Sequence, residues 1–221
     1  MSDRSVAFNE ADALSVFAQI AETRRIWAAV ERLAPRDAQG LCILVTSAAR
    51  AEGKSLLAAG FAALAAQRPQ TRVAAADLNW HRPALHRFFN LTPAFDVARL
   101  RGGASLTDLA RPAGAPNLFV LTAPTLPAAA VDLAPHDSDL AADIVRRLKA
   151  AYEVVIVDGA AVFPTNRRMI DPVRLGAVAD GVVLTVMANA TPRQEVKKAR
   201  VVLERAGARV LGLVLNQRHD G

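Results

Sequence analysis

Short apolar runs alternate along this chain with longer segments in which apolar residues recur at helical spacing. The apolar runs predict strands at 41–45, 72–76, 117–122, 154–157, 181–187 and 208–215. The longer segments predict helices at 56–67, 137–150 and 192–206. Because parallel strands need a crossover connection, this alternation predicts an α/β fold with a doubly wound, mainly parallel sheet flanked by helices.

Two connecting segments carry further local signals. The stretch 91–116 contains prolines and a glycine pair, so we expect a loop there with one short helix at 105–110. The helix predicted at 192–206 is preceded by Thr191 and opens with Pro192. This pair is typical of a helix cap followed by a first-turn proline.

A Gly-Lys-Ser triplet at 53–55 lies between the first predicted strand and the helix after it. Strand, small-residue loop, Gly-Lys-Ser and helix form the layout of a phosphate-binding P-loop, in which backbone N–H groups and the helix dipole attract polyphosphate. Lys54 would bridge the β- and γ-phosphates, and Ser55 would ligate Mg²⁺. A plain strand–turn–helix is the alternative, because Ala48 stands where the full motif has its first glycine. The expected nucleotide-binding residues of this loop are Ala51, Glu52, Gly53, Lys54, Ser55 and Leu56.

Two aspartates follow directly after predicted strands. Asp158 ends the run 154–157, which is the Walker B pattern, and Asp77 ends the run 72–76. The carboxyl ends of parallel strands form the ligand-binding edge of such sheets, and a Walker B carboxylate holds Mg²⁺ there. For Asp77 the alternative is a helix cap for the segment that follows. We therefore expect ATP and Mg²⁺ as cofactors, Lys54, Asp77 and Asp158 as catalytic residues, and Ser55, Asp77 and Asp158 around the metal.

Apolar residues also recur near helical spacing within 1–37, with charged residues between them, until Pro35 and Gly40 end the pattern. This predicts an amphipathic arm. The arm packs either on its own sheet or on a neighbouring subunit, and the sequence leaves both alternatives open. Since the chain has no internal repeat or long linker, we expect an N-terminal helical arm at 1–40 and a P-loop nucleotide-binding domain at 41–221.

Composition narrows the classes of partner and compartment. The net charge is +6 and 23 of the 27 basic residues are arginine, but they are scattered, which argues against a nucleic-acid partner and favours a solvated surface. The four histidines lack metal-ligand spacing. Cys42 is the only cysteine, the longest apolar run (11 residues, Leu56 to Ala66) is too short for a membrane span, and the first residues lack a signal-peptide pattern. We expect a cytoplasmic protein.

With these residues in place, the chain resembles the bacterial tyrosine kinases of capsule and exopolysaccharide assembly, a P-loop group that also contains the partitioning ATPases. The resemblance covers about residues 41–218. The segment 46–55 matches the family's T-S-x-x-P-G-E-G-K-S, except that Arg50-Ala51 replaces Pro-Gly. The family's second motif, D-x-D-L followed by arginines and P-x-L-H, is matched by 75–78 and 82–86, with Ala75 in place of the first aspartate.

This resemblance implies binding of Mg-ATP and transfer of the γ-phosphoryl group to protein tyrosine or to water. It implies that Arg193 lies near the phosphates and Asn216 near the adenine. It also implies a membrane polysaccharide co-polymerase as partner, recruitment to the inner face of the plasma membrane, and a homo-oligomer formed through the N-terminal helix. Of the family's Glu-x-x-Arg-x-x-Arg contact motif on that helix, only Glu22 and Arg25 fit.

Three functions stay open on these grounds. The first is an ATPase or tyrosine kinase-like phosphotransferase. The second is a nucleotide-sensing regulatory subunit, favoured by Ala75 and by a C-terminus that reaches Gly221 without a tyrosine cluster; the single tyrosine, Tyr152, we expect to be an aromatic packing residue. The third is a partitioning-type positioning ATPase, against which the signature-lysine position holds Ala49.

Overall fold

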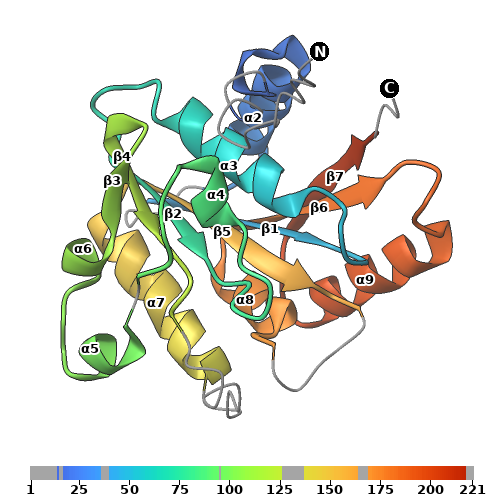
Figure 1. Ribbon diagram of the computed structural model, residues 1–221. Coiled ribbons are helices and arrows are strands. Elements are labelled where there is room, and N and C mark those ends of the chain that lie inside the picture. Colours follow the sequence, from blue (N-terminus) through green and yellow to red (C-terminus); the bar gives the residue numbers. More distant parts are fainter. Residues whose placement is uncertain are drawn as a thin grey trace, which may run out of the picture.

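The computed structural model describes residues 14, 17–35, 40–94, 96–125, 137–163 and 169–217, and Figure 1 shows their arrangement. Much of the expected arm, at 1–13, 15–16 and 36–39, lies outside the described residues. Among those described, no helix is both long enough and apolar enough to cross a membrane.

A seven-stranded sheet with the order β3-β4-β2-β5-β1-β6-β7 forms the centre of the molecule. All neighbouring strands are parallel except β3 and β4. The strands are β1 (Leu41–Ser47), β2 (Val73–Asp77), β3 (Arg111–Ala113), β4 (Ala115–Leu121), β5 (Val154–Ala161), β6 (Gly181–Met187) and β7 (Val210–Asn216). The predicted mainly parallel α/β sheet is thus confirmed. The short edge strand β3 was expected to be loop, and its Pro112 suits only an edge position.

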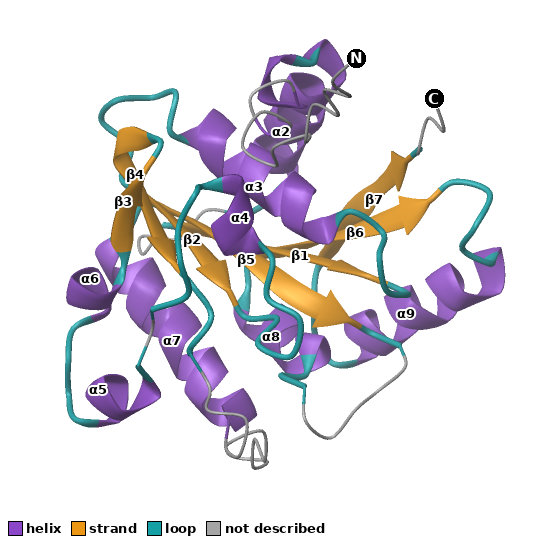
Figure 2. Cartoon of the chain, in the orientation of Figure 1, coloured by secondary structure: helices purple, strands orange, loops and turns teal. Residues whose placement is uncertain are grey.

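Helices cover both faces of this sheet, as Figure 2 shows. Helices α2, α3 and α4 lie on one face, and α7, α8 and α9 lie on the other. The described helices are α2 (Ala21–Leu33), α3 (Lys54–Ala65), α4 (Leu85–Phe88), α5 (Val97–Arg101), α6 (Leu106–Leu109), α7 (Asp137–Ala151), α8 (Pro172–Val178) and α9 (Arg193–Arg205). Helix α8 was missed because its seven residues are too few for a periodic signal, although Asp171 caps its start by accepting a hydrogen bond from the Val173 N–H.

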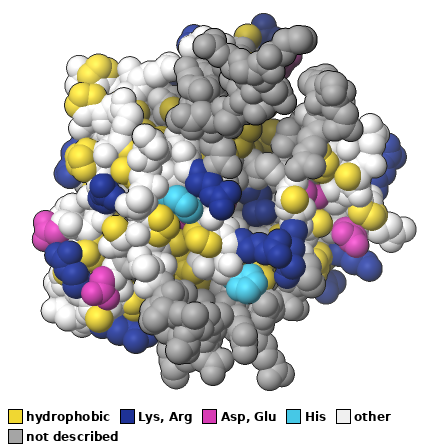
Figure 3. Space-filling model, in the orientation of Figure 1, with side chains coloured by type: hydrophobic (Ala, Val, Ile, Leu, Met, Phe, Trp, Pro, Cys, Tyr) yellow, Lys and Arg dark blue, Asp and Glu magenta, His cyan; other side chains and the backbone are white. Residues whose placement is uncertain are grey.

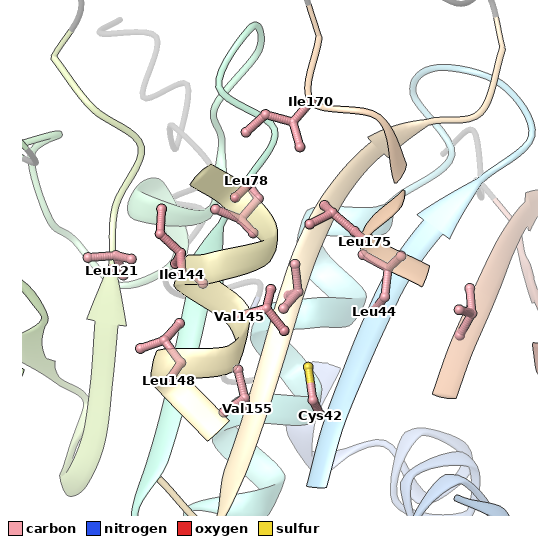
Figure 4. Packing of buried hydrophobic residues seen from close by; sticks show 14 of the residues in the cluster. Cys42, Leu44, Leu78, Leu121, Ile144, Val145, Leu148, Val155, Ile170 and Leu175 are labelled. Carbon is pink, nitrogen blue, oxygen red and sulfur yellow. The ribbon is translucent and has the colours of Figure 1, made fainter. Parts of the chain in front are cut away.

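The two faces of β1 belong to two separate hydrophobic clusters. Ile43 and Val45 point toward α3, whereas Cys42 and Leu44 belong to the cluster on the α7 side. Figure 4 shows Val145 and Leu148 of α7 near Val155, and Leu44 beside Leu175 of α8. Because both faces are buried, every residue of β1 is buried, which explains its unbroken apolar run. Cys42 is accordingly a buried free cysteine.

Helix α2 packs on the outer side of α3, within its own domain. Trp27 of α2 lies against Phe61 of α3, with ring centroids 5.2 Å apart, and both side chains are buried. Glu31 also accepts two hydrogen bonds, of 2.6 and 2.8 Å, from the Arg68 guanidinium beyond α3. The described part of the arm therefore packs on α3, which itself covers the sheet. Contact of the arm with a neighbouring subunit stays a prediction.

A nearly buried ion pair joins elements at the amino ends of the central strands. Lys149 Nζ on α7 lies 2.7 Å from Asp180 Oδ1, and these side chains are 8% and 12% exposed. Asp180 Oδ2 accepts a 2.7 Å hydrogen bond from the Cys42 N–H, and the Asp180 N–H donates to the Cys42 carbonyl. One carboxylate thus holds α7, β1 and the start of β6 together.

Replacing Lys149 should leave the Asp180 carboxylate in a desolvated place without its cation. We expect Lys149→Met to lower the free energy of unfolding by about 3 kcal/mol, measured by urea denaturation. The matched control is Arg146→Met on the same helix, whose partner Asp143 is 4.0 Å away and whose side chain is 62% exposed. That change should stay within about 0.5 kcal/mol. Equal effects of the two substitutions would contradict a structural role for the Lys149–Asp180 pair.

Candidate functional site

The P-loop connects the end of β1 to the first residue of α3. Gly53 has a φ of 82° and Ala51 a φ of 60°, so the chain turns through left-handed conformations just before the helix. A Cβ atom on Gly53 would collide with the side-chain amide of Asn216. Both the backbone angle and the close approach therefore require glycine at position 53. The turn leaves the first N–H groups of α3 facing outward, as an anion site needs.

Glu52 braces this loop from the inside. Its side chain is buried; one carboxylate oxygen accepts a 3.3 Å hydrogen bond from the Ala49 N–H, and the other accepts one from the Thr191 hydroxyl. The Glu52 carbonyl accepts a 3.3 Å hydrogen bond from Asn216 Nδ2. The expectation that Thr191 caps the following helix is wrong: α9 is preceded by Pro192, without a side-chain cap, and Thr191 holds Glu52 instead.

Asp77 and Asp158 lie side by side, because β2 and β5 are neighbours and these residues are in register. Asp158 is fully buried, and neither of its carboxylate oxygens has a hydrogen-bond partner among the described residues. Asp77 accepts hydrogen bonds from the N–H groups of Asn79, at 3.1 Å, and of Ala84 and Leu85, at 3.0 and 3.1 Å. The helix-cap alternative for Asp77 is thus realised at the start of α4, next to the second carboxylate.

Burial dominates the electrostatics of this cluster. It raises the pKa of Asp77 to about 8, with the nearby Asp158 charge adding to the rise. Burial also raises the pKa of Asp158 to about 6, against the opposing effects of the Ser55 hydroxyl and the Lys54 ammonium. The pKa of Lys54 is lowered by burial, which Asp158 and Glu52 partly offset. Asp158 and Glu52 are thus the carboxylates that interact with the Lys54 ammonium, in a poorly solvated place.

A pocket of about 700 Å³ opens above these residues. It is lined by residues from the P-loop, from the segment after β2, and from two positions after β5, namely 50–56, 79, 81–84, 86–88, 161 and 169. Ala51 to Leu56 are thus gathered as the sequence predicts. The lining residues Asn79, His81, Arg82 and Arg87 were not predicted as site residues, although their place directly after β2 was the available signal.

Four predicted site residues are not among those that line this pocket. Asp77 and Asp158 are buried on β2 and β5. Asn216 reaches the P-loop from behind, through its hydrogen bond to Glu52. Arg193 lines a different hollow of about 750 Å³ between α9 and β7, together with apolar residues such as Leu213 and Leu215. The expected place of Arg193 beside the phosphates is therefore not supported by the pocket geometry.

The residues present fit a magnesium–nucleotide group. Among the described residues, no group of three or more His, Cys, Asp or Glu side chains could hold a metal ion unaided. Mg²⁺, however, usually takes one or two protein ligands, several waters and substrate phosphates. The partnerless oxygens of Asp158 and the nearby Ser55 hydroxyl match that smaller set, and the left-handed turn at Gly53 suits a phosphate.

Comparison with known proteins finds relatives of this chain. No family model matches the chain. It is 29% identical over 181 residues to the tyrosine-protein kinase YwqD of Bacillus subtilis, covering 81% of this chain and 73% of that protein. It is 30% identical over 181 residues to the putative tyrosine-protein kinase CapB of Staphylococcus aureus, covering 79% and 74% respectively. The chain belongs to the bacterial tyrosine kinase family.

Other comparisons agree with a place among the bacterial tyrosine kinases. The crystal structure of the chimerical protein CapA2B2 superposes with a TM-score of 0.73 at 27% identity, covering 92% of this chain and 86% of that one. The septum site-determining protein MinD of Pyrococcus horikoshii, complexed with Mg-ADP, shares the fold at 19% identity and a TM-score of 0.65, over 80% and 70% of the two chains. The succinoglycan biosynthesis transport protein ExoP of Rhizobium meliloti is 30% identical over 183 residues, which are 79% of this chain and 22% of that protein.

Removing the Asp158 charge should stabilise the nucleotide-free, magnesium-free protein at alkaline pH. Because burial raises its folded-state pKa, this carboxyl stabilises the fold while protonated, below about pH 4, and loses that contribution as the pH rises through about 6. We expect Asp158→Asn to add on the order of 2–3 kcal/mol at pH 8 and little at pH 4, measured by thermal unfolding across pH.

The control for this measurement is Asp139→Asn, at an aspartate whose side chain is 67% exposed. Its substitution should leave the melting temperature nearly unchanged at both pH values. A melting temperature of Asp158→Asn that falls at pH 8 would show that the buried carboxylate is compensated within the folded chain.

Proposed function

We propose that this chain binds Mg-ATP in the P-loop pocket and transfers the γ-phosphoryl group to a protein tyrosine, in the control of exopolysaccharide assembly. The observation that carries the proposal is Asp158: a fully buried carboxylate without hydrogen-bond partners among the described residues, close enough to Lys54 for each to shift the other's pKa. A buried charge of this kind destabilises a fold that binds no ligand. It becomes favourable where a cation and a polyphosphate bind beside it.

Each residue of the site has a role in this proposal. The N–H groups of 51–56 would hold the phosphates, and Lys54 would neutralise charge that develops on the transferred group. Ser55 and Asp158 would hold Mg²⁺, whose bound state supplies Lewis-acid charge neutralisation. Asp77 would fix the metal's water shell while it anchors the segment after β2. Asn216 would support the P-loop near the nucleoside.

The proposed partner is a membrane polysaccharide co-polymerase, contacted at the cytoplasmic face. Support comes from the relatives: a protein named for succinoglycan biosynthesis transport contains a stretch similar to most of this chain. The structural neighbour CapA2B2 is itself a chimerical protein, and 86% of it superposes on this chain. We further propose that oligomers form through the exposed side of α2, whose Glu22 and Arg25 are both exposed.

A nucleotide-sensing subunit is the second candidate, and one position favours it. Ala75 stands where the family has its first second-motif aspartate, and it is fully buried in the cluster between the sheet and α3. The carboxylate that the family carries there is therefore absent from this site. Losing one such group would cost about 10²–10³-fold in rate, which leaves a transferase slow and a nucleotide sensor unaffected.

Transfer from γ-labelled ATP tests the proposal. Wild type is incubated with Mg-ATP and a tyrosine-bearing partner segment, beside Lys54→Ala and the control Lys197→Ala, an exposed lysine on α9 outside the P-loop pocket. We expect Lys54→Ala to lower transfer about 10²–10³-fold, because a buried cation facing the phosphates is lost, and Lys197→Ala to leave it unchanged.

Calorimetric titration with Mg-ATP separates the two candidates. If wild type binds Mg-ATP with measurable heat but labels no tyrosine, the sensor is favoured. The sensor is also favoured if wild type binds Mg-ATP but releases phosphate no faster than Lys54→Ala. No heat in wild type would remove nucleotide binding and both candidates with it.

A further inference from the structure

The P-loop pocket has two walls of different origin. The first is the P-loop itself, and the second is the segment 79–88, which follows β2 and includes α4. Asn216 contacts the P-loop at Glu52, on the β7 side, whereas Asp77 and Asp158 lie under the second wall at the ends of β2 and β5. The second wall therefore borders the side of the pocket where the metal site and the terminal phosphate would lie. An incoming acceptor must pass it.

The second wall is held in a fixed shape by backbone hydrogen bonds. Asp77 accepts three of them, from Asn79, Ala84 and Leu85. A tight turn closes between Asn79 and Arg82: the Arg82 N–H donates to the Asn79 carbonyl at 2.9 Å, and Asn79 Nδ2 donates to the Arg82 carbonyl at 3.0 Å. Trp80 inside this turn is buried. These hydrogen bonds therefore fix the backbone of the second wall and with it the position of the Arg82 Cα atom.

Positive charge collects around the mouth. Arg50, Arg82 and Arg87 line the pocket and are exposed, and Lys54 lies deeper. Figure 3 shows Lys, Arg and His side chains gathered on this face of the molecule. The one acidic side chain in the lining is Glu52, both of whose carboxylate oxygens accept hydrogen bonds. Among the described residues, neither Arg50 nor Arg82 has a side-chain hydrogen bond or ion pair.

We propose that the second wall selects an acidic acceptor: a tyrosine flanked by Asp or Glu in a partner's peptide segment, read by Arg82 and Arg50. The inference rests on the proposed function and names its substrate class. In the proposed function, Lys54 and the P-loop N–H groups bind the triphosphate. The arginines at the pocket mouth therefore have no phosphate to bind and attract a second negatively charged group. Pro83 and Phe88, also in the lining, give the tyrosine ring apolar surface.

In the transfer itself, the tyrosine phenol oxygen forms a bond to the γ-phosphorus of ATP. The bond from that phosphorus to the bridging oxygen of ADP breaks, and the phenol proton passes to solvent. Arg82 and Arg50 touch only the residues that flank the tyrosine. They are specificity residues, so their loss should raise the KM for the peptide and leave kcat nearly unchanged.

The experiment compares three peptides of one sequence, in which the tyrosine is flanked by Glu, Gln or Lys. Phosphate transfer is measured with the full chain, and binding of the labelled peptides is measured by fluorescence anisotropy with and without a non-hydrolysable Mg-ATP analogue. We expect the Glu peptide to exceed the Lys peptide about tenfold in kcat/KM and in affinity, with the difference shrinking at high salt.

Charge reversal supplies the matched variants. Arg82→Glu should raise the KM for the Glu peptide about tenfold, improve the Lys peptide, and leave the calorimetric affinity for Mg-ATP within about twofold of wild type. Arg50→Glu should act in the same direction. The control is Arg99→Glu on α5, an exposed arginine outside the pocket lining, which should change neither preference.

Two failures are distinguishable in this design. If no peptide is phosphorylated but the Glu peptide binds in an Arg82-dependent way, the transferase proposal fails and the acidic docking wall stands. Equal binding of the three peptides, preference for the Lys peptide, or an equal effect of Arg99→Glu would overturn the inference. A loss of Mg-ATP affinity in Arg82→Glu would also overturn it, by placing that arginine on the nucleotide.

Discussion

The pairing of β2 with β5 imposes the main constraint on this molecule, because it lays two buried aspartates next to each other, and one of them, Asp158, interacts with the buried Lys54. Like charges at this separation cannot both ionise cheaply in a poorly solvated place. The chain meets the problem unequally: Asp77 is surrounded by three backbone N–H donors, whereas Asp158 is left without a hydrogen-bond partner among the described residues. That inequality gives the first carboxylate a structural task and leaves the second open to a ligand.

The features set by strong periodicity or by backbone chemistry were predictable from the sequence. The strand at 181–187 and the start of the helix at Asp137 agree with the structure, because apolar runs and helical spacing report burial directly. The Gly-Lys-Ser triplet indicated a small-residue loop between a strand and a helix, which the positions of β1 and α3 confirm. Asp77 and Asp158 each follow a predicted strand, and this position correctly predicted that they lie together at one edge of the sheet.

What the sequence could not give depends on contacts between distant segments. Thr191 carries the local signature of a helix cap, yet its hydroxyl is used 139 positions away, at Glu52. Arg193 faces a hollow beside β7 because the direction of α9 is set by packing, which a linear motif does not encode. The shape of the second wall has the same origin: the place of His81 and Arg82 after β2 was a signal, but they line the pocket because Asp77 binds the N–H groups of Ala84 and Leu85 and folds the chain back.

Tyr152 is 3% exposed and lies under the Arg72 guanidinium, 5.0 Å from its ring centroid, with Phe119 at 5.7 Å, which confirms its predicted packing role. It is also the chain's single tyrosine. Its phenol is therefore shielded from solvent by the fold. Under the proposed transfer, this sequence offers no exposed tyrosine as acceptor, and a phosphotyrosine antibody should stain the partner segment rather than this part of the protein.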